Sequence, residues 1–495
     1  MVIVACLMLI VSIASSLLAN NAQSHSWFTI PPVYQSGMPI KESLFRNDVL
    51  CGSCSGFLFD DSEYIGGALE VVPFGSESTE PEELARYFFP FDLSSIVVAE
   101  DKAKDVSQRD VDASHFNIKT KRGTFKSFVE IFPQERVAGL GITYKHRISY
   151  RFWWEVSFPV VKVEHTLNFN EKIIDDGGGP VDEIGIEKSP RVGSMEAAFA
   201  QPKFRYGKFF KGSLTRKGVA DVEIKVGYNS CMYDRCHLSS YLGVLVPTGN
   251  RPDGKYVFQP IVGNGHNPAI LYGTNIGFEL WQNGKHQLLM ELDSAFRYIF
   301  SNRQRRSFDV IDKQWSRYME VYRSKLEAEI AGIRQDANGG FFGINIFTQC
   351  VRVHPRFTSN VTTAFVYRYS KVAAELGYNF FVRQAEKVTL KWEERPAFED
   401  IKGMGFTNKA RTIRDNFACC PVEPQHYTSV KKRDLYIDSA AHPCAVSNSI
   451  YATLGIRNDD CRFPFIIGFG GSYEFALINT AINRWVFWGK LGISF

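Results

Sequence analysis

The chain has 495 residues, enough for one very large domain or for several domains of average size. Its charges almost cancel, with 57 Lys and Arg against 53 Asp and Glu and a formal net charge of +4, and both signs are interspersed along the sequence. This balance argues against a nucleic-acid partner. After the first two dozen residues no uncharged apolar run reaches about 18 residues, which excludes a polytopic helical membrane protein.

The N-terminal segment has the features of a secretory signal. Residues 2–18 are apolar, and the small or polar residues 19–24 follow before the first charges appear. We therefore predict that residues 1–24 are a signal peptide, although no Lys or Arg precedes the apolar run. The alternative is an uncleaved anchor helix.

The cysteines fit an exported protein with local disulfides. Cys51 and Cys54 form a CxxC pair, and Cys231 and Cys236 bracket a short connection between two strand-like runs. Export to an oxidising compartment favours disulfides within these two pairs. The CxxC pair alone is also compatible with a redox pair or half of a zinc site. Because no second CxxC and no suitably spaced histidine pair accompany it, we predict no metal site.

Apolar and polar residues alternate over most of the chain from residue 122 onward, which is the period of a strand with two different faces. In residues 221–229, for example, Val222, Ile224 and Val226 alternate with Glu223 and Lys225. The pattern predicts fourteen strands at 122–132, 136–147, 151–163, 217–229, 238–248, 269–281, 285–300, 314–323, 339–353, 360–370, 372–384, 448–457, 463–475 and 484–495.

The connections between these strands alternate in length. Long loops at 164–216, 249–268, 301–313 and 385–447 all fall at one end of the strand array, and most short turns fall at the other. This asymmetry is typical of a transmembrane antiparallel β-barrel. We predict an all-β fold with a single barrel of about 14 strands, within a range of 12 to 16, over residues 122–495. The connections 133–135 and 324–338 fit less well, and a further strand at 63–73 would shift the count.

Residues 25–121 show no sustained alternation. They include a prolyl pair, the CxxC cysteines and a short helix expected after Ser78 and Thr79. We interpret this segment as an N-terminal extension that plugs the barrel or lies on its periplasmic side. A separate small domain is the alternative.

The last strand carries the most specific motif. Phe487, Leu491, Ile493 and Phe495 lie on one face by alternation, and the strand ends on an aromatic residue. This pattern resembles the assembly signal of Gram-negative outer-membrane β-barrel proteins. The plan of residues 122–495 is similar to that of the porins and of the long-chain fatty-acid transport channels. The resemblance implies an outer-membrane location, contact with outer-membrane lipid, recognition by the barrel-assembly machinery and passage of small solutes.

Alternation also assigns a lumen-facing set. The candidates are Lys145, Glu155, Asp221, Glu223, Lys225, Glu279, Glu291, Asp293, Arg297, Arg368, Glu375, Arg383, Arg457, Glu474 and Lys490. Eight of them are acidic and seven are basic, so we expect weak ion selectivity. Pairs such as Lys225 with Glu223, Arg297 with Asp293 and Arg368 with Glu375 are equally well read as salt bridges that stiffen the wall.

No catalytic signature is present in the sequence. It lacks GxSxG, HExxH and a phosphate-binding loop, so we expect no catalytic residue, no cofactor and no enzyme activity. The function predicted from these features is passive diffusion or facilitated transport of small solutes through a porin-like channel. One alternative is a non-conducting structural or adhesive surface barrel cross-linked by cysteines, and a further one is an outer-membrane hydrolase. Oligomeric state has no signal in the sequence.

Overall fold

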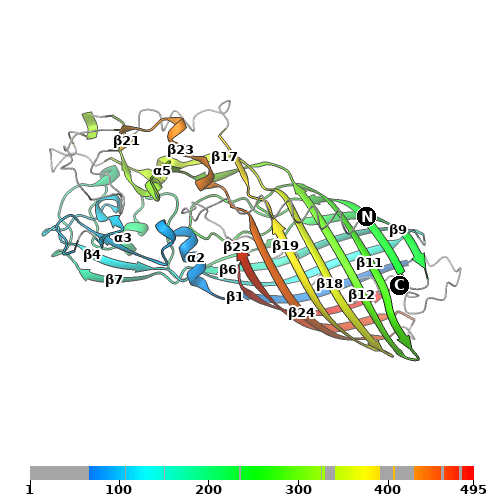
Figure 1. The fold of residues 1–495 in the computed structure, drawn as a ribbon. Helices are drawn as coiled ribbons and strands as arrows, with labels where there is room; N and C mark the ends of the chain where they lie inside the picture. The colour runs from blue at the N-terminus through cyan, green and yellow to red at the C-terminus, as the bar shows by residue number, and fades with distance from the viewer. Residues whose placement is uncertain are drawn as a thin grey trace.

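The computed structural model describes residues 66–105, 108–149, 151–233, 236–324, 326–328, 330, 340–390, 405–406, 428–458, 462–478 and 482–495. It is an elongated molecule with a β-barrel at one end and a second folded region at the other (Figure 1). We call this second region the cap. It comprises the described residues within 79–133, 167–212, 247–268, 300–355 and 384–444.

Twelve antiparallel strands close into the barrel. The order of neighbours is β5, β1, β26, β25, β24, β19, β18, β12, β11, β10, β9 and β6, and β6 pairs with β5 to complete the ring. The strands are β1 (Gly66–Ser78), β5 (Gln134–Arg147), β6 (Phe152–Thr166), β9 (Val222–Tyr233), β10 (Cys236–Val246), β11 (Ala269–Asn283), β12 (His286–Ile299), β18 (Arg356–Tyr369), β19 (Val372–Arg383), β24 (Ala445–Asn458), β25 (Phe465–Ile478) and β26 (Arg484–Ser494).

A thirteenth strand, β8 (Ser213–Val219), lies outside this ring. It pairs with the end of β6 that is nearest the cap, and β9 pairs with the other end of β6. Ala220 and Asp221 separate β8 from β9. The two strands therefore form one interrupted strand along β6, of which only the β9 part belongs to the closed barrel.

The two faces of the barrel strands have opposite polarity. Along β26, Phe487 and Leu491 are exposed on the outside, while Arg484 and Lys490 are buried on the inside. The same alternation places Leu376 of β19 outside and its neighbour Glu375 inside. Because backbone groups in a bilayer must all be paired, only a closed sheet of this kind can present such a surface to lipid. The predicted all-β barrel is confirmed, and twelve strands fall within the predicted range.

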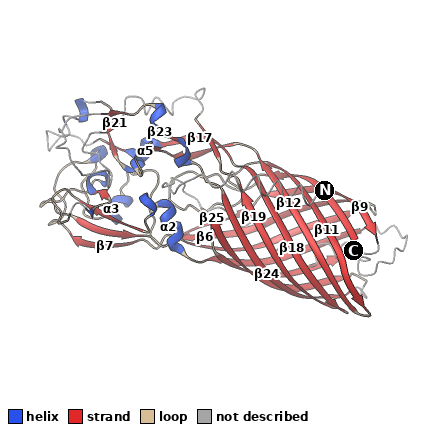
Figure 2. Cartoon of the chain, viewed as in Figure 1, coloured by secondary structure: helices blue, strands red, loops and turns tan. Residues whose placement is uncertain are grey.

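All long connections leave the barrel at the cap end, where β25 also connects to β26, and the other short connections lie at the opposite end (Figure 2). The carboxy-terminal residue Phe495 also lies at the short-turn end, where its backbone N–H and carbonyl bond to Gly67. This arrangement confirms the loop asymmetry expected from the sequence. Within the described part of the chain, no helix is long and apolar enough to cross a membrane.

Eleven of the fourteen predicted strands are barrel strands, and three predictions were wrong. Residues 122–132, 314–323 and 339–353 belong to the cap, where they contribute only short strands and helical turns. The barrel strand β1 was assigned to the extension because Gly66, Gly67 and Pro73 interrupt its alternation. With β1 added and those three segments removed, residues 134 and 135 of the poorly fitting connection 133–135 become the start of β5.

The boundary predicted at residue 121 therefore needs correction. Residues 66–78 close the barrel by pairing with β26 on one side and β5 on the other. Residues 81–130 form helix α2 (Pro81–Phe88) and a sheet in the cap rather than a separate extension. The rest of the predicted extension, residues 25–65, lies outside the described residues, as do the predicted signal peptide, Cys51 and Cys54.

The cap is built from short elements. Four strands pair in the order β3, β2, β4, β7, and three in the order β13, β17, β20. The remaining elements of the cap are described after α2 as η3 (Pro90–Asp92), β2 (Ser95–Ala99), β3 (Val111–Asp112), η5 (Ala113–Phe116), β4 (Lys126–Glu130), β7 (Asn170–Asp175), η6 (Ile186–Lys188), α3 (Met195–Ala200), β13 (Asn302–Ser307), β14 (Asp309–Val310), η7 (Ser316–Tyr318), β15 (Glu320–Val321), β16 (Phe341–Phe342), α5 (Gly343–Phe347), β17 (Thr348–His354), β20 (Lys387–Thr389), β21 (Gly405–Phe406), β22 (Thr428–Ser429), η8 (Lys432–Asp434), β23 (Leu435–Tyr436) and η9 (Ile437–Ala440).

An aromatic core holds the cap together. Trp315 packs its ring 5.4 Å from Phe88 and 5.0 Å from Tyr318, and its indole N–H donates to the Phe88 carbonyl at 2.8 Å. Phe116 and Phe199 join the same cluster. These five residues come from three different connections between barrel strands. The long loops therefore fold together as one unit with its own hydrophobic interior.

Candidate functional site: the lumen of the barrel

The predicted lumen residues all lie along the strands of the barrel. Asp221 is at the junction of β8 and β9, and the other fourteen are within barrel strands. Several of them, such as Lys225 on β9 and Lys490 on β26, alternate with residues that are exposed on the outer surface. Their side chains are buried or partly buried, and the acidic and basic members are intermixed around the wall.

Four of the predicted residues form a continuous chain of ion pairs, which we call the lumen ion-pair chain. Arg297 of β12 donates to Glu223 of β9, with Nη2 and Oε1 3.2 Å apart. The Lys225 ammonium lies 3.1 Å from the other oxygen of Glu223 and 3.0 Å from Oε1 of Glu155 on β6. Two strands, β10 and β11, separate β12 from β9. The chain therefore passes across the inner faces of five consecutive strands.

The surroundings of this chain are crowded. Tyr241 places its ring 5.2 Å from the Lys225 ammonium. The Tyr241 ring also covers Gly273, where a Cβ atom would come within 2.3 Å of it. The Lys225 side chain is only 3% exposed. The lumen is consequently narrow at this level, and charges of both signs line it.

Other predicted residues make local contacts along the wall. Lys490 pairs with Glu70 of β1 at 3.2 Å, and Glu375 accepts a hydrogen bond from Tyr451. Glu279 accepts from the Gln287 amide at 2.7 Å. The Lys145 ammonium lies over the Trp153 ring, 4.1 Å from its centre. These contacts fix the directions of individual charges between neighbouring strands.

Of the ion pairs suggested by sequence spacing, the structure bears out one. Lys225 does contact Glu223. Arg297 contacts Glu223, and Asp293 receives the Asn275 amide at 3.3 Å. Arg368 donates to the Gln287 side chain at 3.5 Å. Spacing along one strand could not identify partners contributed by strands distant in the sequence.

A second cluster lies where the lumen meets the cap, and we call it the rim cluster. The Arg484 guanidinium contacts Glu474 at 2.6 Å and Glu135 at 3.5 Å. Glu135 also lies 3.0 Å from Nε2 of His165, whose Nδ1 is 2.6 Å from the Phe258 carbonyl of the cap. All four side chains are almost fully buried. The rim cluster thereby joins β5, β6, β25 and β26 to a loop of the cap.

Only Glu474 of the rim cluster was among the predicted lumen residues. Glu135 and His165 fall just beyond the ends of the predicted strands, and Arg484 is the first residue of β26. Extending the alternation by two residues would have found Glu135, because it shares the parity of Lys145 on β5. His165 likewise shares the parity of Glu155 on β6.

Three other predicted lumen residues lie near the ends of the barrel. Asp221 accepts the backbone N–H of Asn264 at 2.8 Å, which ties the β8 and β9 junction to the cap. Arg383 ends β19 at the cap side, whereas Arg457 lies at the short-turn side of β24. The structure does not bring these residues into the lumen ion-pair chain. Glu291, on β12, lies opposite Gly277 and Ala364.

The residues predicted as an assembly signal form the outer face of the last strand. Phe487, Leu491, Ile493 and Phe495 are all exposed on the lipid-facing side. The strand β26 that carries them pairs with β25 and with β1, so it occupies the position where the barrel closes. Recognition of this strand by the assembly machinery stays a prediction.

The predicted disulfide between Cys231 and Cys236 is not shown. Across the β9 and β10 pairing, Cys231 lies opposite Leu238 and Cys236 lies opposite Tyr233. The two cysteines are therefore diagonal rather than direct neighbours, a separation that is usually longer than the Cα distance in a disulfide. This bridge stays a prediction.

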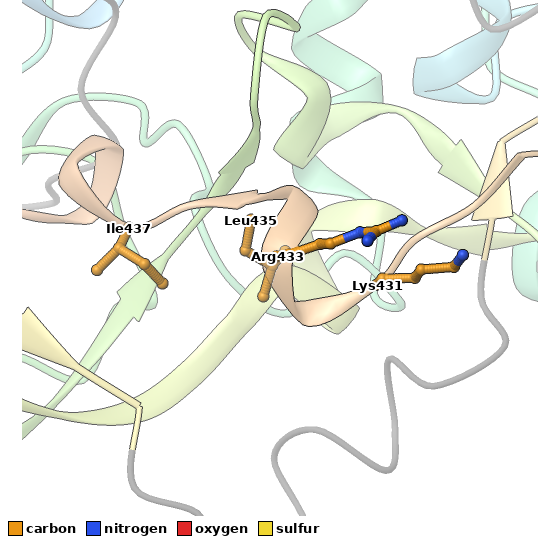
Figure 3. A pocket seen from close by; sticks show the side chains of 4 residues that line it. All are labelled: Lys431, Arg433, Leu435 and Ile437. Carbon is orange, nitrogen blue, oxygen red and sulfur yellow. The ribbon is translucent and has the colours of Figure 1, made fainter.

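The cap has an open pocket of about 600 Å³ lined by Lys431, Arg433, Leu435 and Ile437 (Figure 3). It lies on η8, β23 and the start of η9, away from the barrel strands. None of the predicted site residues contributes to it. Among the described residues, no group of three or more His, Cys, Asp or Glu side chains is placed to hold a metal ion.

The outer surface of the barrel has the composition expected of a lipid contact. Exposed apolar side chains include Leu242, Leu376 and Phe469, and exposed aromatic rings include Tyr272 and Trp281. A closed antiparallel barrel with such a surface is the form in which strands cross the outer membrane of Gram-negative bacteria. The chain is an outer-membrane β-barrel protein, as the sequence predicts.

No protein-family model and no curated protein matches the sequence. Similar solved structures include an outer membrane channel from Pseudomonas putida F1, at 10% identity over 88% of this chain and 99% of that one, with a TM-score of 0.36. The CymD monoaromatic hydrocarbon channel matches at 8% identity over 94% and 97% of the two chains, with a TM-score of 0.29. A Pseudomonas aeruginosa FadL homologue matches at 8% identity over 96% and 99%, also with a TM-score of 0.29.

Proposed function

We propose that this protein is an outer-membrane channel through which small solutes pass by passive diffusion or facilitated transport. The single observation that carries the proposal is the inner face of the closed barrel, where polar and charged side chains replace the apolar ones of the outer face. A polar lumen solvates small hydrophilic molecules, whereas a barrel that served only as an anchor would need no such lining.

The lumen ion-pair chain acts as the constriction of this channel. Arg297, Glu223, Lys225 and Glu155 alternate in sign across the wall, and each charge has an opposite charge beside it. Because no ring of a single sign is formed there, the field along the lumen favours neither cations nor anions strongly. The channel therefore has weak ion selectivity, and its size limit is set by this chain of side chains.

A second candidate is a non-conducting surface barrel that presents the cap. The observation that favours it is the burial of the charged lumen residues: Lys225 and Glu155 are each 3% exposed. Salt bridges that fill the lumen in this way would stiffen the barrel without leaving a path. The cap has its own aromatic core, and it would then be the functional part of the protein.

Single-channel conductance in planar bilayers distinguishes the two candidates. We expect steady conductance from the refolded protein and a larger conductance from Lys225→Ser, because the shorter side chain opens the constriction. The matched control is Lys162→Ser. Lys162 also lies on a strand and pairs with a glutamate, but its side chain is 47% exposed on the outer face. Conductance of the control should equal that of the wild type.

The predicted plug requires a narrower deletion than the sequence alone indicates. Removing residues 25–121 would delete β1 and open the barrel wall. A deletion of residues 25–65 leaves all twelve barrel strands in place. Higher conductance after this deletion would support a plug. If the wild type, Lys225→Ser and the deletion are all silent although correctly folded by heat-modifiable migration, the channel proposal is wrong.

A further inference from the structure

The hairpin of β12 and β18 continues beyond the barrel as a small sheet. β13 follows β12, and β17 precedes β18. These two strands pair with each other, and β17 also pairs with β20 on its other side. In Figure 1, β17 lies past the rim of the barrel at the side of the cap. The sheet is thus an outward extension of the membrane-spanning wall.

The two faces of this sheet differ in charge and burial. One face is buried against the cap and carries Val351, Val353 and Val388. Its charged member, Arg306, is 3% exposed and pairs with Glu386 at 3.3 Å. The opposite face, which we call the basic face, is accessible. It consists of Arg303, Arg305, Cys350, Arg352, His354, Lys387 and Thr389.

The strand register assembles the basic face. Arg303 lies directly opposite Arg352, Arg305 lies opposite Cys350, and His354 lies opposite Lys387. Directly opposed side chains of an antiparallel pair project from the same face, so the cationic side chains of Arg303, Arg305, Arg352 and Lys387 lie close together. Like charges in this arrangement repel each other, and they are stabilised when an anion binds between them.

Three cations of the basic face have no carboxylate partner among the described residues. Within the described part of the chain, no salt bridge joins Arg305, Arg352 or Lys387 to a carboxylate. Arg305 donates instead to the Tyr206 hydroxyl at 2.7 Å and lies 5.2 Å from the centre of the Tyr206 ring. This contact leaves its positive charge unneutralised and holds the guanidinium in one direction.

The basic face adjoins the lipid-facing aromatic residues of the barrel. Tyr298, which is exposed on the outside of β12, packs edge-on against the His354 ring at 5.5 Å. Phe300 packs against Tyr298 at 5.4 Å and is also exposed. Aromatic residues of this kind mark the level of the lipid headgroups. The cations therefore lie at the level of the headgroups or just above it.

The pKa of His354 is consistent with a positive electrostatic field at the basic face. Burial lowers the pKa of its imidazole, and the positive charges of Arg356 and Lys387 lower that pKa further. A site in which neighbouring cations suppress another positive charge is a site with a net positive field. Its neutral ring remains available for packing against Tyr298.

We propose that the basic face binds the phosphate groups of lipid A in the outer leaflet. The cap end of the barrel faces the outside, because long connections are external in outer-membrane barrels. Guanidinium groups bind phosphate through paired hydrogen bonds, and an ammonium group adds charge. Acyl chains of the same lipid would lie along the apolar wall beneath Tyr298 and Phe300. The site therefore matches an amphipathic lipid with anionic headgroups at the interface.

The test measures binding of lipid A to the full-length protein in neutral detergent micelles. Bisphosphorylated lipid A is compared with lipid A of identical acyl chains from which both phosphates have been removed. The variant Arg305→Gln with Arg352→Gln should bind the phosphorylated lipid about 25-fold more weakly, since each basic side chain near an anionic surface contributes about a factor of five. Lys387→Gln alone should bind about fivefold more weakly.

Two controls separate charge from disturbance of the fold. Cys350→Ser changes a residue opposite Arg305 on the same face without changing its charge. Arg122→Gln with Lys211→Gln removes two exposed cations from other parts of the cap, where they pair with Asp175 and Glu196. Both controls should bind lipid A as the wild type does, and all variants should show heat-modifiable migration.

Three outcomes would overturn the proposal. Equal binding of phosphorylated and dephosphorylated lipid A would show that the phosphates are not recognised. Equal affinity for phosphatidylglycerol micelles or for inorganic phosphate would show that lipid A is not the source of the anion. Unchanged binding by a folded Arg305→Gln and Arg352→Gln variant would remove the basic face from the site. If this double variant does not fold, Lys387→Gln decides between these results.

Discussion

The barrel and the cap are built on opposite arrangements of polar and apolar residues. In the barrel, Leu376 and Phe469 are more than half exposed, and the neighbouring Glu375 is buried. In the cap, Trp315 is buried, and Lys211 is exposed with its ammonium near a glutamate. The barrel therefore exposes apolar side chains and buries charged ones, whereas the cap does the reverse. Substitutions of the same kind should have opposite consequences in the barrel and in the cap.

The largest effect is expected from removing the central ring of the cap. Trp315→Ala should destabilise the cap by about 3–5 kcal/mol, because it deletes a buried ring and leaves a cavity. Limited proteolysis should then cut the cap at concentrations of protease that leave the wild type intact. The barrel should retain heat-modifiable migration.

The matched control for Trp315→Ala is Phe469→Ala, which removes a ring from the outside of β25. It should leave protease resistance of the cap unchanged. If Trp315→Ala instead abolishes folding of the barrel, the two regions fold as one unit, and the contrast between them fails.

A smaller effect is expected from placing a charged residue on the outer face of the barrel. Leu376→Arg should destabilise the folded barrel by up to about 2–4 kcal/mol, depending on its depth, because the guanidinium must be placed in hydrocarbon. Urea-dependent refolding into lipid vesicles measures this change. Ile174→Arg, at an exposed apolar position of the cap strand β7, should change stability by less than about 0.5 kcal/mol. Equal effects at both positions would mean that Leu376 does not face lipid.

The smallest effect is expected for the pH dependence of the stability of the cap. Burial lowers the pKa of His115, and Arg109 lowers it further against the opposing effect of Asp112. The folded cap therefore binds fewer protons at this site than the unfolded cap, so its free energy of unfolding falls as the pH drops below about 6.5. The protection factors of cap amides, which are corrected for the intrinsic pH dependence of exchange, should therefore fall between pH 7.5 and pH 5.

In His115→Gln this part of the pH dependence should disappear. The amide can still accept the backbone N–H of Glu320, which donates to His115 Nδ1 at 3.3 Å in the wild type. Exchange of barrel amides serves as the internal reference. An identical pH profile for the cap in wild type and variant would contradict the assignment of this sensitivity to His115.

Much of the barrel could be predicted from the sequence because lipid and lumen impose a period of two on every strand. β19 and β26 show that period over nearly their whole lengths, and both were placed within a few residues. β1 was missed since glycine and proline weaken its pattern. The cap has no period to detect, because its core joins residues such as Phe88 and Trp315 from separate loops.

The candidate site was only partly predictable for a similar physical reason. Alternation assigns a residue to the inner face but does not say which residue lies across from it. Glu223 contacts Arg297 from a strand three positions farther around the barrel, and no spacing in the sequence encodes that contact. The rim cluster was missed because Glu135 and His165 lie where strands continue past the expected membrane boundary.

The accessibility of spin labels along β19 in lipid vesicles tests most directly whether the barrel faces lipid on its outside and encloses a polar lumen. Single labelled cysteines would replace Ala374, Leu376 and Tyr378 on one parity, and Ala373 and Glu375 on the other, in a background without other cysteines. We predict that the first set is accessible to oxygen, which dissolves in lipid, and that the second set is not. Reversed parity, or equal exposure of both sets to a water-soluble relaxation agent, would contradict a lipid-facing barrel with a polar lumen.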